Sequence, residues 1–262
     1  MNTYKELVKL LFKRLFIVVL FFQLCRISFY LFNKNSFDNL TLLNLLGGLH
    51  FDLSAIGYIN LIFIIGHLIP GNFKFNPGYQ KGLKISFYVI NLLFIATNFV
   101  DFEYYKFTGR RSTFGLITAS GMENEIGGLI LSFLAEFWFI PLFFIAISLL
   151  FWKLIGTFKI QEINPKTDFK SLLKQTAILI LCFGIGFLMA RGGFQKKPLK
   201  VVDAISYGTT NNTPVILNTP FCILKTIGKK ETLESPNFYK KAELDAIFNP
   251  VVQTQPTLPQ QK

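Results

Sequence analysis

Charged side chains interrupt the longest apolar stretches of this 262-residue sequence. Asp52 follows the run LLNLLGGLHF, and Glu136 lies within ILSFLAEFWFI. A charged group in membrane hydrocarbon costs at least about 2.5–3.5 kcal/mol, so such groups are retained where they pair or line a wet cavity. These two acids therefore predict a paired polar site within a membrane protein.

The segment NFVDFEYYKFTGRRSTFG, residues 98–115, adds acidic and basic groups where an apolar stretch ends. Arginine suits phosphate because its guanidinium fork can bind two oxygens at once. We therefore expect a pocket for lipid headgroups near one membrane surface, with four acids, four arginines and one histidine. Its candidate residues are Arg26, His50, Asp52, Asp101, Glu103, Arg110, Arg111, Glu136 and Arg191.

A plainer interpretation of several candidates stays open. Asp101, Glu103 and Arg110 could be solvated residues at a helix end, and Arg26 could extend its charge toward water along an apolar surface. His50 shares one helical face with Gly47, Ser54 and Gly57, which favours a packing role over a ligand surface.

The composition predicts an all-α membrane protein. Hydrophobic residues make up 51% of the chain and charged residues 16%, against about 25% charged residues in a typical soluble domain. A spanning helix needs about 20 mostly apolar residues. Five segments satisfy that requirement, at approximately 15–32, 45–69, 83–104, 129–152 and 172–190, and they define a transmembrane domain over residues 1–190.

The distribution of basic residues predicts the orientation. Lys and Arg number 12 in residues 1–14, 70–84 and 153–174, but 4 in residues 33–44 and 105–128. Because positive loops stay in the cytoplasm, we expect a cytoplasmic N-terminus and an extracytoplasmic tail after residue 190. The net charge of +12 is thus interpreted as an orientation signal, and no nucleic-acid partner is predicted.

The tail is expected to contain two parts. Residues 191–250 form a juxtamembrane segment with short amphipathic helices near 214–226 and 238–248, of a kind that lies in the membrane interface. Residues 251–262 are rich in Pro and Gln, and we expect them to be a linker to a missing catalytic domain. The 3 Cys and 2 His of the chain show no disulfide or metal-ligand spacing, and no catalytic residue is predicted.

The chain resembles the membrane part of bacterial lipoteichoic-acid-synthase-like proteins of the Bacteroidetes type. The segments that carry the resemblance are LLGGLHFDLSAIGYIN (45–60), NFVDFEYYKFTGRRST (98–113), ARGGFQKKPL (190–199), ILNTPF (216–221) and KKAELDAIFNP (240–250). The resemblance implies five membrane helices followed by an extracytoplasmic sulfatase-like domain of the alkaline phosphatase superfamily. That domain would begin after Lys262, with a Thr nucleophile and a divalent metal, usually Mn²⁺.

The resemblance also implies a function for the chain. The family transfers phosphoglycerol or phosphoethanolamine from a phospholipid, so we expect a non-catalytic anchor that presents the lipid donor in the bacterial cytoplasmic (inner) membrane. Its expected partners are the bilayer, anionic or zwitterionic headgroups and the sulfatase-like domain. The alternative is a small stand-alone membrane scaffold or transporter.

Overall fold

The fold is known from a computed structural model that describes residues 2–117, 136–156 and 168–229. Residues 1–228 group into one compact unit. All regular elements within the described ranges are helices, which confirms the predicted all-α class. The expected amphipathic helix at 238–248 and the linker at 251–262 lie outside the described residues.

Four of the described helices are long and apolar enough to cross a membrane. At 1.5 Å per residue, about 20 residues cross the hydrocarbon core, and each of these helices exceeds that length. They are α1 (Asn2–Phe32), α2 (Leu42–Leu68), α3 (Pro77–Thr108) and α7 (Phe169–Arg191).

The fourth predicted span is only partly described. Helix α6 (Phe139–Leu154) has 16 residues, and residues 129–135 of the predicted 129–152 span are outside the described ranges. Helix α1 contains the predicted span 15–32 and is longer, because it begins at Asn2. The predicted cytoplasmic connection 1–14 is therefore largely the first part of a helix.

Local sequence signals set the helix ends. Thr41 caps α2 through a reciprocal pair of hydrogen bonds with Asn44. Asn76 caps α3, whose first residue is Pro77, a position that needs no backbone N–H donor. Gly109 ends α3 and Gly192 ends α7, with φ values of 64° and 88° that favour glycine.

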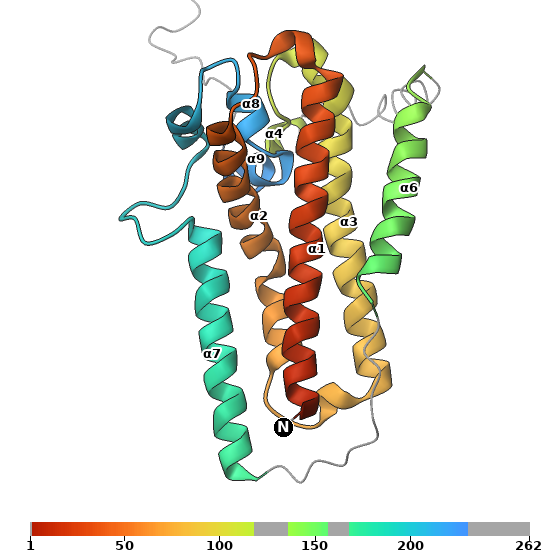
Figure 1. Ribbon diagram of the computed structural model, residues 1–262, viewed down its shortest axis with the longest axis vertical. Coiled ribbons are helices and arrows are strands. Elements are labelled where there is room, and N and C mark those ends of the chain that lie inside the picture. The colour runs from red at the N-terminus through yellow and green to blue at the C-terminus, as the bar shows by residue number, and fades with distance from the viewer. Residues whose placement is uncertain (1, 118–135, 157–167, 230–262) are drawn as a thin grey trace, which may run out of the picture. The chain divides into compact units, whose positions relative to one another are not determined.

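Helices α1, α2 and α3 pack side by side and alternate in direction (Figure 1). We call the end where α1 begins the basic end, and the end where α1 finishes the site end. Between these ends, Asn60 of α2 and Asn91 of α3 exchange two side-chain hydrogen bonds of 2.9 Å each. This reciprocal pair satisfies both buried amides and fixes the register of the two helices.

Helix α7 packs against α2 along a seam of small residues. A Cβ placed on Gly57 would lie 2.5 Å from the Ala190 amide nitrogen and 3.0 Å from the Gly186 carbonyl oxygen. Ser54 Oγ donates to the Ala190 carbonyl at 2.6 Å. The predicted packing role of this face of α2 is thus confirmed, because close approach of the two backbones requires small side chains.

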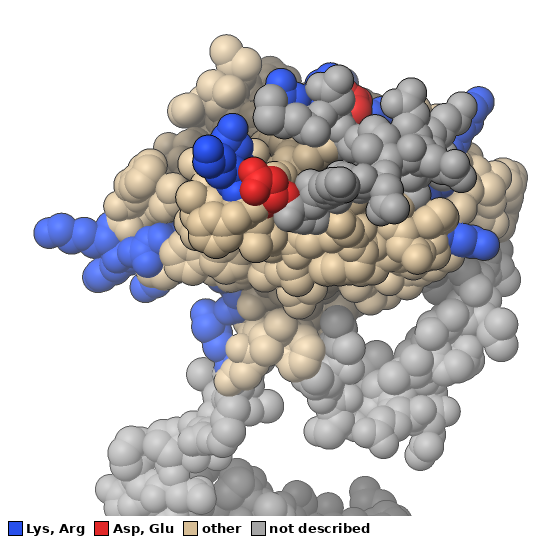
Figure 2. Space-filling model, turned by 90° about the horizontal axis from the view of Figure 1, so that it is seen from below, with Lys and Arg blue, Asp and Glu red and all other residues tan. Residues whose placement is uncertain are grey.

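Basic side chains gather at the basic end, which Figure 2 views directly. Two described acids are exposed at this end, Glu6 on α1 and Asp168 at the start of α7. The exposed basic residues at this end lie on α1, α3, α6 and α7 and are Lys5, Lys9, Lys13, Lys81, Lys153, Lys170 and Lys174.

Candidate functional site

Part of the predicted juxtamembrane segment 191–250 folds back onto the site end of the helices. From here on, the juxtamembrane segment means this part, residues 199–226. The segment contains the 3-10 helix η3 (Val201–Tyr207) and the helices α8 (Thr213–Ile216) and α9 (Thr219–Thr226) (Figure 1). Val215, Ile216, Phe221 and Cys222 are all buried. The single amphipathic helix expected at 214–226 is therefore corrected, since it is split into α8 and α9, which pack against α1, α2 and α3.

Arg26 of α1 and Asp52 of α2 form a buried ion pair next to this segment. Asp52 is fully buried, and its carboxylate also accepts hydrogen bonds from Gln23 Nε2 and Asn218 Nδ2, each at 2.7 Å. Three donors, two from α1 and one from the N-cap of α9, thus surround one carboxylate. Such surroundings are what a buried charge requires, because its desolvation must be offset by a counter-charge and hydrogen bonds.

The Arg26 guanidinium also binds the backbone of the juxtamembrane segment. Its Nη1 donates to the carbonyls of Val215, Ile216 and Leu217, at 2.6 Å for Ile216 and 3.3 Å for Leu217. Its Nη2 donates to the Gly48 carbonyl at 2.8 Å. A Cβ on Gly48 would collide with the guanidinium, so glycine is required where α2 passes this arginine.

A second buried ion pair joins Asp101 of α3 to Arg111, with 3.6 Å between Oδ2 and Nη1. The Asp101 carboxylate also accepts from the Ser112 amide and from Thr219 Oγ1, the latter at 2.6 Å. Arg111 Nε donates to the Pro214 carbonyl at 2.8 Å. Burial lowers the pKa of Arg111 to about 10, while the charge of Asp101 acts in the opposite direction, so Arg111 stays protonated at neutral pH.

Arg111 also lies over an aromatic ring. Its guanidinium carbon is 3.4 Å from the centre of the Phe29 ring on α1. This contact brings α1, the end of α3 and the juxtamembrane segment together around one cation, and a desolvated cation–π contact of this kind contributes about 2 kcal/mol.

His50 joins the same assembly at its edge. One ring nitrogen, Nε2, lies 2.7 Å from the Gly192 carbonyl, and the other, Nδ1, lies 2.8 Å from the Tyr207 hydroxyl. Since a carbonyl only accepts, Nε2 carries a proton and Nδ1 can accept from the tyrosine. His50 thereby ties α2 to the end of α7 and to η3.

The other predicted residues lie apart from the two ion pairs. Arg110 is exposed, and Glu136 is exposed three residues before α6 begins. Arg191 binds the carbonyls of Gln195 and Lys196 in its own loop. Glu103 is buried but binds Lys106 one turn along α3. The structure therefore does not bring Arg110, Glu136 or Arg191 into the cluster of the two ion pairs.

Several residues of the site were missed in the sequence. Asn218 and Thr219 contact the two acids, and the only available signal was Asn218-Thr219-Pro220, a typical beginning of a helix. At the basic end, Arg14 is fully buried against His67 Nε2 at 2.6 Å and the Ile155 carbonyl at 3.2 Å. Buried charge is therefore found at both ends of the helices, contrary to the expectation of one shared depth.

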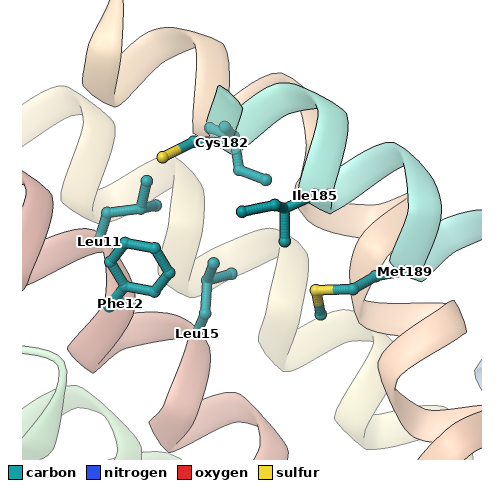
Figure 3. Close-up of a pocket in the computed structure, with 8 residues that line it drawn as sticks. Leu11, Phe12, Leu15, Cys182, Ile185 and Met189 are labelled. Carbon is teal, nitrogen blue, oxygen red and sulfur yellow. The ribbon is translucent and has the colours of Figure 1, made fainter. Parts of the chain in front are cut away.

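An apolar crevice lies between α1 and α7, where Ile64 of α2 also lines it. Figure 3 shows Leu11, Phe12 and Leu15 of α1 facing Cys182, Ile185 and Met189 of α7. The cavity measures about 30 Å³ and has almost no polar lining, so it offers packing space but no headgroup chemistry.

The arrangement can hold a segment of chain. No group of three or more His, Cys, Asp or Glu that could hold a metal ion occurs within the described ranges. Nη1 and Nη2 of Arg26 and Nε of Arg111 donate to carbonyls and a carboxylate of the chain itself. These two arginines act as clamps on residues 214–219.

Comparisons of this chain with family models, with curated proteins and with solved structures found no match.

Proposed function

We propose that this chain is the membrane anchor of a cell-envelope headgroup transferase of the sulfatase-like type, and that it presents donor lipids to a catalytic domain outside the cytoplasm. The observation that carries the proposal is the clamp on residues 214–219 by Arg26 and Arg111. A freely moving anchor would need no such clamp, whereas a transferase must hold its catalytic domain at a set distance from lipid headgroups.

The clamp fixes the position at which the chain leaves the helices. Release of the segment would leave the donors of Arg26 and Arg111 and the two carboxylates without these hydrogen-bond partners, and each buried polar group left unsatisfied costs about 1–3 kcal/mol. Residues beyond Thr226 therefore start from a defined place at the site end. The resemblance to lipoteichoic-acid-synthase-like membrane domains supplies the chemistry of the proposed catalytic domain, including its Mn²⁺.

The charge distribution supports the orientation that the proposal needs. The basic end carries most of the exposed lysines, and positive ends face the cytoplasm. The site end would then face away from the cytoplasm, in the outer leaflet of a bacterial inner membrane.

Donor headgroups would meet exposed cations around the site end rather than the buried pairs. Arg110 is exposed at the end of α3, and Lys196 and Lys197 are exposed beyond α7. A phosphate at the bilayer surface can bind such side chains without displacing any internal contact.

The test uses the whole chain in nanodiscs that contain a phosphatidylethanolamine with a photoreactive headgroup. We expect covalent adducts at residues 107–110 and 191–197, reduced at least threefold by Arg110→Gln combined with Lys196→Gln and Lys197→Gln. A matched triple variant at the basic end, Lys5→Gln, Lys9→Gln and Lys13→Gln, should leave these adducts unchanged. Adducts confined to the basic end, or insensitive to both variants, would refute the lipid-presenting role.

A further inference from the structure

Two buried cations lie near each other at the basic end, away from the clamp. Arg14 of α1 is fully buried, and Lys84 of α3 is 9% exposed. The Arg14 guanidinium carbon is 5.9 Å from the centre of the Phe87 ring, one turn along α3 from Lys84, and its charge acts on Lys84. The Lys84 ammonium nitrogen lies 4.1 Å from the centre of the Trp152 ring on α6. Helices α1, α3 and α6 thus enclose two positive charges.

The contacts of Arg14 are all with neutral groups. Its Nη1 lies 2.6 Å from His67 Nε2, and its Nε donates to the Ile155 carbonyl at 3.2 Å. Since His67 Nδ1 lies 2.8 Å from the Phe63 carbonyl, Nδ1 carries the proton and Nε2 accepts from Arg14. The carbonyl groups at the end of α6 supply only partial negative charge. The full charge of Arg14 is therefore not balanced by any acid among the described residues.

Lys84 has no hydrogen-bond acceptor in the described part of the chain. Its contact with the Trp152 ring leaves ammonium donors for another acceptor. The described acids of the basic end serve other residues, because Glu6 pairs with Lys9 at 2.7 Å and Asp168 is exposed at the start of α7. A buried cation needs a counter-charge to offset its desolvation, so Lys84 points to an anion that the described residues do not supply.

Two exposed lysines raise the positive potential at the same place. Gly156, whose carbonyl accepts from Arg14 Nη2 at 3.5 Å, would place a Cβ 3.8 Å from Lys13 Nζ. Lys153 is exposed in the last turn of α6. Basic pockets between membrane helices on the cytoplasmic side bind anionic headgroups. A phosphate suits this set better than a carboxylate, because it brings up to two negative charges and more acceptor oxygens.

We propose that Lys84 binds a phosphate group at the basic end, supported by the charge of Arg14. Lys84 is the direct ligand because its donors are not used by the described chain, whereas Nε and Nη1 of Arg14 already bind chain atoms. The phosphate can belong to a phospholipid of the adjacent leaflet or to a soluble ion, since both present the same oxygens. Because positive ends face the cytoplasm, this site lies on the opposite membrane surface from the proposed donor site, and it does not depend on the transferase role.

The experiment measures phosphate binding to the full chain in phosphatidylcholine nanodiscs. One arm adds phosphatidic acid to the bilayer and counts the lipid molecules that the protein retains in native mass spectrometry. The other arm titrates inorganic phosphate in a calorimeter. Lys84→Met removes the charge and keeps an unbranched side chain against Trp152, and Lys84→Arg keeps the charge. Lys81→Met is the matched control, because it removes an exposed charge one turn away on the same helix.

We expect Lys84→Met to lower retention of phosphatidic acid at least fivefold, with Lys84→Arg and Lys81→Met within twofold of the unmodified chain. Binding of inorganic phosphate alone, lost in Lys84→Met, would support the phosphate class and assign a soluble source. Binding of neither probe would overturn the proposal. Equal losses in Lys81→Met and Lys84→Met would also overturn it, because general surface charge would then explain the attraction.

Glu162 supplies a further test, since it is the one acid of residues 157–167, which lie outside the described ranges. Phosphate binding that appears only in Glu162→Gln would identify this acid as the counter-ion of Lys84 and overturn the proposal. None of these outcomes alters the adduct pattern expected of the headgroup-presenting anchor at the site end, so the two proposals fail separately.

Discussion

Asn218 and Thr219 are consecutive residues whose side chains bind two different buried carboxylates. Asn218 Nδ2 donates to Asp52 on α2 at 2.7 Å, and Thr219 Oγ1 donates to Asp101 on α3 at 2.6 Å. The beginning of α9 therefore bridges the two ion pairs, and neither pair can be altered without an effect on the same turn of chain.

The Arg26–Asp52 pair should show strong energetic coupling. Asp52→Asn leaves the Arg26 charge buried without its counter-ion, so we expect a loss of about 3–5 kcal/mol in the free energy of unfolding. The double variant Arg26→Met with Asp52→Asn should lose less than the sum of the single variants Arg26→Met and Asp52→Asn, by at least about 1 kcal/mol. Thermal unfolding in detergent micelles measures this cycle, and strict additivity would mean that the pair is not coupled.

The neighbouring residues Arg110 and Arg111 provide a matched test of the clamp that Arg111 forms on the juxtamembrane segment. Arg111→Lys loses the contact of a planar guanidinium with Phe29 and one of its fixed donors, so we expect a destabilisation of about 1–3 kcal/mol. Arg110→Lys changes an exposed residue and should stay within about 0.5 kcal/mol of the unmodified chain. Equal effects of the two substitutions on unfolding temperature would contradict the clamp.

The α2–α7 seam predicts different outcomes for two glycines. Gly57→Ala forces a methyl group against the backbone of α7 and should lower the unfolding temperature by several degrees. Gly184→Ala on α7 meets no atom within 4 Å and should be neutral or stabilising, because alanine has the higher helix propensity. A neutral result for Gly57→Ala would show that α7 does not approach α2 this closely.

Lys74 should make stability depend on pH. It is buried in the α2–α3 loop, where it donates to Gln175 Oε1 at 2.6 Å and lies over the Tyr4 ring, and burial lowers its pKa to about 8. Between about pH 8 and its ordinary value of 10.5, the unfolded chain binds more protons, so stability rises with pH over this window.

The variant Lys74→Met should remove that rise, while the exposed Lys81→Met should keep it. Unfolding temperatures measured from pH 7 to pH 10 distinguish the two variants. A flat profile for the unmodified chain would show that Lys74 keeps an ordinary pKa.

The helices and the acid–arginine character of the site could be predicted, because both follow from local composition. Apolar runs of sufficient length identify α1, α2, α3 and α7, and the cost of buried charge indicates a paired role for Asp52, with Arg26 among the candidate residues. The small-residue face of α2 could also be predicted, because Ser54 and Gly57 are three positions apart and so lie on one face of a helix.

The partners of these charges could not be predicted, because they depend on the path of the chain far along the sequence. Arg26 meets carbonyls about 190 residues later, and no periodicity in the sequence indicates such a contact. Glu136 had the same apolar surroundings as Asp52, yet it is exposed before α6, so composition alone did not separate the two acids. The burial of Arg14 could not be predicted, because its position near the N-terminus favoured a solvated loop.

Hydrogen–deuterium exchange of the chain in nanodiscs tests the clamp most directly, because it reports on residues 214–223 separately from the helices. We predict slow exchange of these amides in the unmodified chain and in Glu136→Gln. In the variant that combines Asp52→Asn with Asp101→Asn, exchange should become at least tenfold faster there, while the amides of α2 near Asn60 stay protected. Equal protection of residues 214–223 in all three proteins would contradict the account.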